Sequence, residues 1–332
     1  MPLSNKRVLA GVSLAALAAL TLYAQQTKPQ AQSAVPTEES GAVFHSDTRL
    51  VVCHVTVVDK NGRLVTDLPQ GAFSVFENDV QQPIHSFRRE DVAVSMGLII
   101  DNSGSMRDKR AKVEAAATAL AEDSNKDDEV FVVNFNDEPF LDNPHGKDFT
   151  NDINEIREAL TRIDSRGGTA MRDAIRVSID HLKEHAHKDK KVLVVVTDGN
   201  DNSSMISLEN LIKVSQQADV LTYAVGLLSE EERREARRAE RALKDLTDAT
   251  GGECFFPKDL SEVDKIAHQV ARDIRSQYTI TYSPTNAAMD GSYRRIKVTV
   301  NSAGHPTVRT RSGYYATPDQ GPPKESGQPA MK

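Results

Sequence analysis

The residues best able to do chemistry in this 332-residue chain are oxygen-bearing side chains in three short loops. The loops have the sequences DNSGS at residues 101–105, GGT at 167–169 and TDG at 197–199. Carboxylates and hydroxyls without imidazole or thiolate suit a hard cation, Mg²⁺ above all, with Mn²⁺ as a substitute. The pattern predicts a divalent-metal site, on the condition that the fold brings the three loops together.

The loops adjoin apolar strands that alternate with amphipathic helices over residues 92–275. Strands are expected at 94–100, 130–135, 192–197, 220–226 and 254–256, and helices at 109–122, 153–163, 170–185, 208–218, 230–249 and 261–274. Continuous apolar runs, such as VLVVV at 192–196, are typical of strands covered on both faces. This order predicts an α/β fold with a doubly wound, mostly parallel sheet, in which ligands bind at the carboxyl ends of the strands.

The order and types of the loop residues resemble the von Willebrand factor A (VWA) family. The metal-ion-dependent adhesion site of that family has the pattern Asp-x-Ser-x-Ser, followed by Thr and then by Asp. The matching residues in this chain are Asp101, Ser103, Ser105, Thr169 and Asp198, with no departure from the pattern. The resemblance extends over residues 92–275, and the flanking segments also resemble the VWA-related proteins of acidobacteria.

The resemblance implies a role for each of these residues. Ser103 and Ser105 would bind the metal through their hydroxyls, and Thr169 would bind it directly or through water. Asp101 and Asp198 would complete the site, largely through waters. Neutral hydroxyls offset little of the metal's charge, so an open coordination position stays electrophilic and suits an Asp or Glu carboxylate of a partner protein. The implied function is non-enzymatic protein binding, in adhesion or in scaffolding.

Three alternatives compete with this interpretation. Residues 101–105 can be read as an ordinary turn and helix cap, because Asp, Asn, Ser and Gly favour such positions. A metal-dependent hydrolase or phosphotransferase is the rival function, but Ser103 stands where a second carboxylate would be needed, and the loops hold no Ser/His/Asp or Cys/His arrangement. In the third alternative the metal site is vestigial and the flanking β segments form the interaction surface.

Segments on both sides of the α/β region have the two-residue period of β-strands. They cover residues 46–90 and 277–316, and the second is too small to fold alone. We therefore expect the two segments to pair into one smaller all-β module. The two cysteines, Cys53 and Cys254, fall in predicted strands of different domains, and the sequence leaves their pairing open.

The amino end of the chain has the layout of an export signal. Two basic residues at 6–7 precede an uncharged run at 8–24, so residues 1–24 are expected to be a signal peptide or a retained N-terminal anchor. Residues 25–45 are expected to form a flexible linker and residues 317–332 a disordered tail. The protein is thus expected to be exported, as a periplasmic, envelope-associated or secreted protein, and to contact a membrane only through an uncleaved anchor.

The net charge of the chain argues against one class of partner, and the remaining polar clusters are interpreted as ordinary surface groups. A net charge of −7 and a pI near 5.8 argue against a nucleic-acid partner. We expect the histidines at 181, 185 and 187 to face water, and the charged segment 230–241 to be a solvated helix. Asn136, Asp137 and Asp201 lie close to the candidate loops in sequence and are interpreted as ordinary loop polarity.

Overall fold

The computed structural model describes residues 50–89, 91–162, 164–228 and 231–317. The predicted signal peptide or anchor, the linker, and all but the first residue of the predicted tail lie outside these residues. Within the described ranges, no helix is long and apolar enough to cross a membrane.

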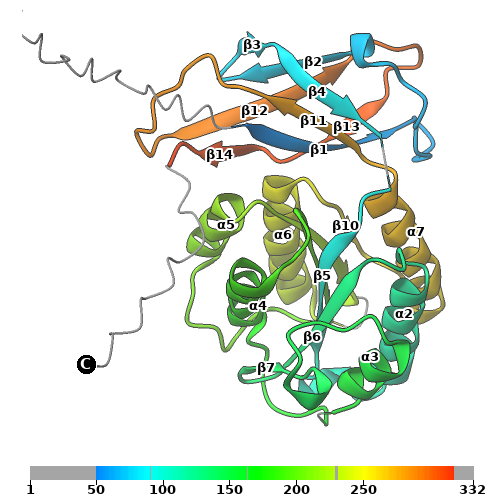
Figure 1. Ribbon diagram of the computed structural model, residues 1–332. Helices are drawn as coiled ribbons and strands as arrows, with labels where there is room; N and C mark the ends of the chain where they lie inside the picture. The colour runs from blue at the N-terminus through cyan, green and yellow to red at the C-terminus, as the bar shows by residue number, and fades with distance from the viewer. Residues whose placement is uncertain (1–49, 90, 163, 229–230, 318–332) are drawn as a thin grey trace, which may run out of the picture. The chain divides into compact units, whose positions relative to one another are not determined.

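A six-stranded sheet forms the centre of the α/β region (Figure 1). In the order in which the strands lie side by side, it consists of β10 (Cys254–Phe255), β9 (Val220–Gly226), β8 (Lys190–Thr197), β5 (Val94–Asp101), β6 (Glu129–Phe135) and β7 (Pro139–Leu141). All neighbours are parallel except β7, a short antiparallel edge strand that the sequence did not predict. Every residue of β5 and β9 is buried, as continuous apolar runs predict for central strands.

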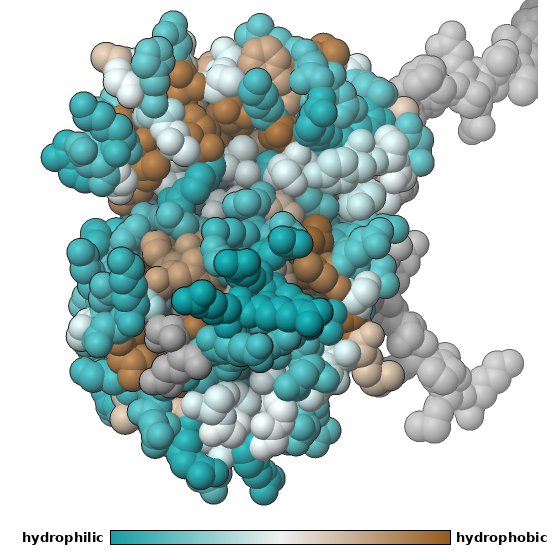
Figure 2. All heavy atoms as spheres, turned by 180° about the vertical axis from the view of Figure 1, so that it is seen from behind, coloured by the Kyte–Doolittle hydropathy of each residue, from teal (hydrophilic) through white to brown (hydrophobic). Residues whose placement is uncertain are grey.

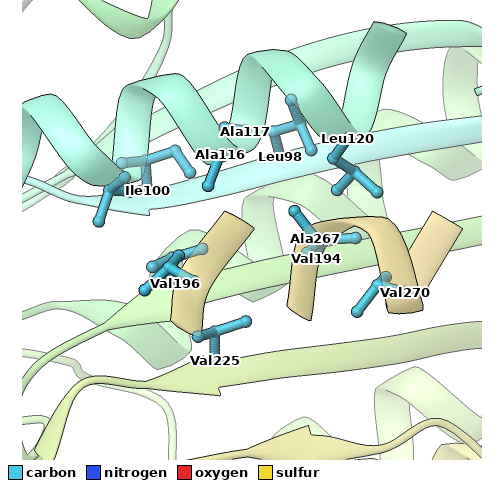
Figure 3. A pocket seen from close by; sticks show the side chains of 12 residues that line it. Leu98, Ile100, Ala116, Ala117, Leu120, Val194, Val196, Val225, Ala267 and Val270 are labelled. Carbon is cyan, nitrogen blue, oxygen red and sulfur yellow. The ribbon is translucent and has the colours of Figure 1, made fainter. Parts of the chain in front are cut away.

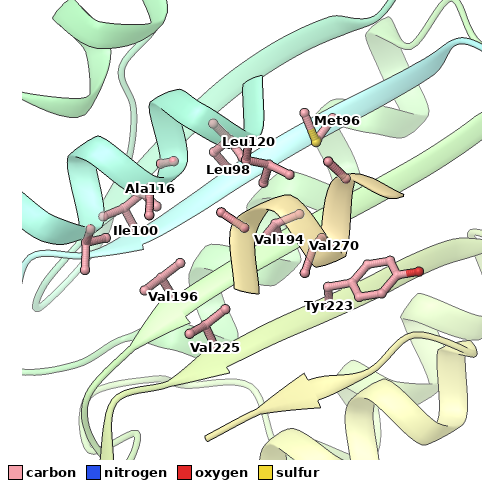
Figure 4. Packing of buried hydrophobic residues seen from close by; sticks show 14 of the residues in the cluster. Met96, Leu98, Ile100, Ala116, Leu120, Val194, Val196, Tyr223, Val225 and Val270 are labelled. Atoms are coloured by element: carbon pink, nitrogen blue, oxygen red, sulfur yellow. The ribbon is translucent and has the colours of Figure 1, made fainter. Parts of the chain in front are cut away.

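Helices cover both faces of this sheet, so the predicted fold class is confirmed. One face packs against α2 (Arg110–Glu122), α3 (Ile153–Leu160) and α7 (Val263–Arg275), and the other against α4 (Met171–His185), α5 (Leu208–Gln217) and α6 (Arg233–Thr250). Figure 4 shows the first face, where Leu98 and Ile100 of β5 pack with Leu120 of α2 and Val270 of α7. Short 3₁₀ helices lie at η1 (Gln70–Ala72), η2 (Gly104–Met106), η3 (Pro144–Gly146) and η5 (Leu260–Glu262).

Two helices, α6 and α3, end at residues other than the predicted ones. The α6 helix continues to Thr250 and stops at Gly251, whose φ of 91° is left-handed and whose amide donates to the carbonyl of Thr247. The α3 helix begins after Asp152, whose carboxylate accepts from the amide of Asn154, and it ends earlier than predicted.

A small apolar cavity lies beneath α7 (Figure 3). Its volume is about 20 Å³, and side chains of α2, α7 and the central strands line it, among them Leu98, Val194 and Val270. A cavity of this size has room for about one water molecule, but an apolar lining offers that water no hydrogen-bond partner. The cavity is therefore a small packing gap under the helix.

The flanking segments form two four-stranded antiparallel sheets that share one apolar core. The first sheet has the order β13 (Thr307–Arg309), β1 (Val51–Val58), β11 (Tyr278–Tyr282), β4 (Ile84–Arg88), and the second has the order β14 (Gly313–Tyr315), β12 (Tyr293–Val300), β2 (Phe73–Glu77), β3 (Val80–Gln82). Both sheets mix strands from the two ends of the α/β region, as the smaller all-β module of the predicted fold requires. Alternate residues of β1 fill the shared core with Tyr278 and Ile280 of β11.

The cysteines lie on separate sheets and are not bonded to each other. Cys53 is buried in β1, and Cys254 is half-buried in β10. Burial raises the pKa of the Cys53 thiol to about 11, which leaves it protonated and inert at neutral pH.

Candidate metal centre

The three candidate loops meet at the carboxyl ends of the parallel strands. The first follows β5, the third follows β8, and the second precedes α4. Backbone hydrogen bonds join the first two loops, from Gly104 N to Gly167 O at 3.2 Å and from Arg166 N to Asn102 O at 2.9 Å. A side-chain bond joins the first loop to the third, because Ser105 Oγ donates to Asp198 Oδ1 at 2.8 Å. Residues about sixty to ninety positions apart therefore share one site, as is common at this edge of doubly wound sheets.

Two serine hydroxyls and a carboxylate form the centre of this site. Ser103 Oγ lies 3.1 Å from Ser105 Oγ, which in turn contacts Asp198. Two ligands at adjacent corners of an octahedral Mg²⁺ shell are about 3 Å apart, given metal–oxygen distances of about 2.1 Å. The spacing and the oxygen chemistry of these residues fit a small hard cation.

Asp101 is placed to support the first loop. Its Oδ1 accepts from the amide of Ser103 at 2.8 Å, and its Oδ2 accepts from Thr197 Oγ1 at 2.6 Å. The side chain is almost completely buried, and burial raises the pKa of this carboxyl to about 6, although the bonds from Thr197 and Ser103 lower it. With both oxygens occupied by protein donors, Asp101 fits an indirect role that orients the loop and supplies charge.

Thr169 lies at the same edge of the sheet, and hydrogen bonds of its backbone fix its position. Its amide donates to Asn202 Oδ1 at 2.9 Å, and its carbonyl accepts from the amide of Asn202. Gly168 N donates to Asp137 Oδ1 at 2.7 Å, and the left-handed φ of Gly167 brings the backbone so close to Asp137 that a Cβ would collide with it. The glycines of this loop thus allow Thr169 to reach the site.

Two of the polar residues first interpreted as ordinary loop polarity brace the second loop. Asp137 binds the glycine pair, and Asp201 Oδ2 accepts from the amide of Arg172 at the start of α4 while its Oδ1 pairs with the Arg172 side chain at 3.0 Å. Asn136 contributes its carbonyl, which accepts from Ala170 N. The sequence signal that could have identified these residues was their proximity to the candidate loops.

Sequence reasoning missed Lys109, which lies against the site. Lys109 Nζ is 2.7 Å from Asp198 Oδ2, and both side chains are buried. The residue directly precedes α2 and its amide donates to the carbonyl of Met106, so the chain turns back toward the loop it has just left. A lysine at a helix start reads as solvated in a sequence, and only the fold reveals that it is buried.

A polar groove of about 170 Å³ opens beside the candidate ligands. Ser105, Thr169 and Gly199 form one part of its wall, and Glu231 and Glu235 form another. Burial, together with the nearby negative charge of Asp198, raises the pKa of Glu231. The groove gives a ligand access to the candidate metal position.

The serine hydroxyls of the site contact oxygen atoms. The contacts that the structure gives Ser103 and Ser105 through their hydroxyls are with each other and with Asp198, and none of them involves an imidazole. Within the described residues, the hydroxyls of Ser103 and Ser105 thus face other oxygens, and the Ser/His/Asp arrangement is not seen there.

A second group of metal-ligating types lies at the far end of α4. Ligand atoms of Asp148, His181 and His185 are all within 4.8 Å of one another. The expectation that His181 faces water is wrong, because the residue is only 8% exposed. Its ring packs against Phe131 and Phe149, and its Nε2 lies 2.8 Å from the carbonyl of Asp148. Because this nitrogen already has a backbone partner, we assign His181 a structural role.

Comparisons with known proteins place these features in context. A family model for the von Willebrand factor type A domain matches residues 96–269, more than half of the chain. Mouse integrin alpha-11 is 29% identical to this chain over a match that covers 31% of the chain and 11% of the integrin. An uncharacterized protein of Borreliella burgdorferi is 36% identical over 24% of the chain and 23% of that protein. The chain thus spans only a small part of the length of these relatives.

Solved structures give similar matches at low sequence identity. A von Willebrand factor type A protein from Catenulispora acidiphila has a TM-score of 0.48 and 16% identity, and the match covers 82% of this chain and 75% of that one. The vWF domain of the type V pili tip protein Mfa5 from Porphyromonas gingivalis has a TM-score of 0.44 and 12% identity, with 55% and 97% covered.

Proposed function

Because the chain belongs to the von Willebrand factor type A domain family, we propose that it is a non-enzymatic, metal-dependent protein-binding module. Domains of this family typically serve adhesion or protein interaction. The proposed ligand is an Asp or Glu carboxylate on a partner protein. The observation that carries the proposal is the convergence of Ser103, Ser105 and Asp198 from two separate loops within hydrogen-bond distance of one another.

The candidate ligands divide into two groups by their contacts. Ser103 and Ser105 would bind Mg²⁺, or Mn²⁺, through their hydroxyls, and Thr169 would join them from the opposite loop. Asp101 and Asp198 would supply negative charge and act largely through water. When bound, the metal would supply an electrophilic position that accepts a carboxylate from outside.

The surface supports a polar mode of recognition. On the face that Figure 2 shows, hydrophobic residues occur in separate patches among hydrophilic ones. The large apolar side chains that are exposed lie in different parts of the chain, such as Val80 in β3, Leu141 in β7 and Met205 in the loop before α5. The carboxylate of the partner, bound at the metal position, would therefore be a major source of binding specificity.

We propose that the module acts outside the cytoplasm, in adhesion or in scaffolding of envelope components. The apolar run at 8–24 behind two basic residues supports export. Whether the run is cleaved or retained decides between a secreted or periplasmic protein and an anchored one. Labelling of the mature amino terminus in the native host distinguishes the two.

Calorimetric titration with Mg²⁺ tests the metal site directly. The wild-type protein is expected to release or absorb heat with a single-site isotherm, and Ser103→Ala is expected to abolish it, because a hydroxyl ligand is lost without a change of charge. Ser302→Ala, in a loop of the β module, serves as the matched control and should behave as wild type. Absence of binding by the wild-type protein would refute the proposal.

Partner capture tests the function that the metal serves. The protein is immobilised and exposed to native envelope extract, first in Mg²⁺ and then in chelator. Partners that are released on chelation, and that Ser103→Ala fails to retain, support metal-dependent binding. If the protein instead hydrolysed generic ester or phosphate substrates and Asp101→Ala removed that activity, the binding proposal would have to be abandoned.

A further inference from the structure

The candidate metal centre contains a fixed positive charge of its own. Lys109 Nζ contacts Asp198 Oδ2 at 2.7 Å, while Asp198 Oδ1 accepts from Ser105 at 2.8 Å. The Lys109 side chain is 7% exposed and that of Asp198 is fully buried. One carboxylate is therefore shared between a serine that is a candidate metal ligand and an ammonium group.

The local fold holds Lys109 in this position. Gly104–Met106 forms the short helix η2, and the amide of Lys109 donates to the carbonyl of Met106 at 3.0 Å. The Lys109 carbonyl in turn accepts from the amides of Lys112 and Val113, which begins α2. The backbone of Lys109 is thus part of the same turn as the candidate ligands, and the contact with Asp198 holds its ammonium group against the site.

The charge of Lys109 has a consequence for metal affinity. Protein sites for hard divalent cations gain affinity with the number of negatively charged ligands. Two of the five candidate ligands, Asp101 and Asp198, are carboxylates and the other three are neutral hydroxyls, while Glu231 and Glu235 line the adjoining groove. An ammonium paired with one of the two carboxylates lowers the net negative charge that a divalent cation meets.

We propose that Lys109 is a positioning residue that holds the metal affinity of the free protein low, so that a carboxylate ligand is needed to retain the metal. The incoming carboxylate restores the negative charge that Lys109 offsets. Metal and carboxylate then strengthen each other's binding by the same factor, as thermodynamic linkage requires. This inference rests on the function proposed above, because it concerns the same site.

The test compares Mg²⁺ titrations of the wild-type protein, Lys109→Met and Lys109→Arg. Methionine keeps most of the length of the side chain and removes the charge, and its Mg²⁺ dissociation constant is expected to be about tenfold lower than that of the wild type. Lys109→Arg keeps the charge and should remain close to the wild type. Lys112→Met removes an exposed charge from α2, the helix that follows Lys109, and should change nothing.

A carboxylate probe tests the second half of the proposal. Sodium acetate, compared with sodium chloride at equal ionic strength, is expected to tighten Mg²⁺ binding by the wild-type protein more than by Lys109→Met. An equal effect of acetate on both proteins would contradict the coupling. The thermal midpoint gives a further readout, since Mg²⁺ should raise it more in Lys109→Met than in the wild type, whereas a purely structural role of Lys109 predicts equal Mg²⁺ effects.

The outcomes separate this inference from the proposed function. If the wild type binds Mg²⁺ and Lys109→Met binds it equally or more weakly, the role of Lys109 is wrong and the metal site stands. If neither protein binds Mg²⁺ at millimolar concentration, both proposals fail. The ion pair between Lys109 and Asp198 would then neutralise the carboxylate in place of a metal. Should Lys109→Met not fold, Lys109→Gln is measured in its place, with circular dichroism as the check of folding.

Discussion

The α/β region buries charged residues at both ends of its central sheet, and the two ends balance those charges differently. At the carboxyl ends of the strands, Asp101 and Asp198 are surrounded mainly by hydroxyls, with Lys109 as a cation. At the amino ends, where the sheet meets the β module, Arg309 pairs with Asp273 and Glu253. Arg311 also pairs there with Asp219, directly before β9.

The two ends of the sheet are therefore suited to different roles. At the junction each arginine is tied to a carboxylate by a directional ion pair, and this pairing fixes the two side chains in place. Hydroxyls around a carboxylate can rotate and can give up their bonds to a cation. The junction is therefore suited to holding α7 and β13 together, and the loop end is suited to binding.

The largest expected effect is at the junction. Arg309→Met leaves Asp273 buried without the guanidinium that lies 2.7 Å from its Oδ2, and we expect the free energy of unfolding to fall by about 3 kcal/mol. Urea unfolding measures this change. Arg309→Met combined with Asp273→Leu should recover most of the loss, because the buried charge of Asp273 is then removed and Glu253, the other partner of Arg309, is partly exposed. A single variant as stable as the wild type would show that this pair does not hold the junction.

An intermediate effect is expected from pH at the loop end. The folded pKa of Asp101, about 6, is above that of an unfolded aspartate, about 3.9. The metal-free folded protein therefore binds more protons than the unfolded chain between these values, and its free energy of unfolding falls, by about 1–2 kcal/mol, as pH rises from 4 to above 6. The affinity for Mg²⁺ should rise over the same range, because an ionised Asp101 adds negative charge beside the metal position.

Asp101→Asn is the control for this pH effect. Unfolding in chelator at pH 5 and at pH 7.5 should show a smaller difference for the variant than for the wild type, because the raised carboxyl is absent. Identical pH dependence in the two proteins would mean that Asp101 does not titrate in this range.

The smallest effect is expected on the exposed face of α6, which belongs to neither end. Arg238 Nη1 lies 3.1 Å from Glu235 Oε1, one helical turn away, and more than half of the arginine side chain is exposed. Arg238→Ala should change the free energy of unfolding by less than about 0.5 kcal/mol and leave metal-dependent partner capture unchanged. A clear loss of capture would instead identify this charged face as a docking surface.

Strand and helix periodicity predicted the α/β fold, because long apolar runs allow few alternatives. The runs at β5 and β8 are buried along their whole length, and the helices between them have one apolar face each. The short strands β3 and β7 were missed, since three residues carry too little periodicity to distinguish a strand from a loop. Each of them pairs with the strand directly before it, β2 and β6 respectively, across a short turn.

The candidate ligands could be selected from the sequence because their types and order are local patterns. The groups around them could not. Lys109 and Thr197 acquire their partners only when separate loops meet, and the bracing role of Asp201 depends on the direction in which α4 begins. Burial of a charged or polar residue is a property of the whole fold, and for that reason His181 was also misjudged.

The pairing of β1 with strands from the other end of the chain governs the order in which the protein can fold. Val51 lies opposite Tyr282 of β11, and Val57 lies opposite Val308 of β13. During synthesis, β1 leaves the ribosome long before either partner strand exists, while every strand of the central sheet is made in between. The α/β region can thus fold first and bring the two ends together, which shortens the loop that β1 must close.

Until then β1 remains an apolar strand with two unpaired edges and an accessible thiol at Cys53. Such strands are the usual starting points of aggregation in slowly folding chains. The yield of native protein should therefore depend on the time that passes before β1 pairs with β11 and β13. In an exported chain, the Cys53 thiol would be exposed to oxidants during that time.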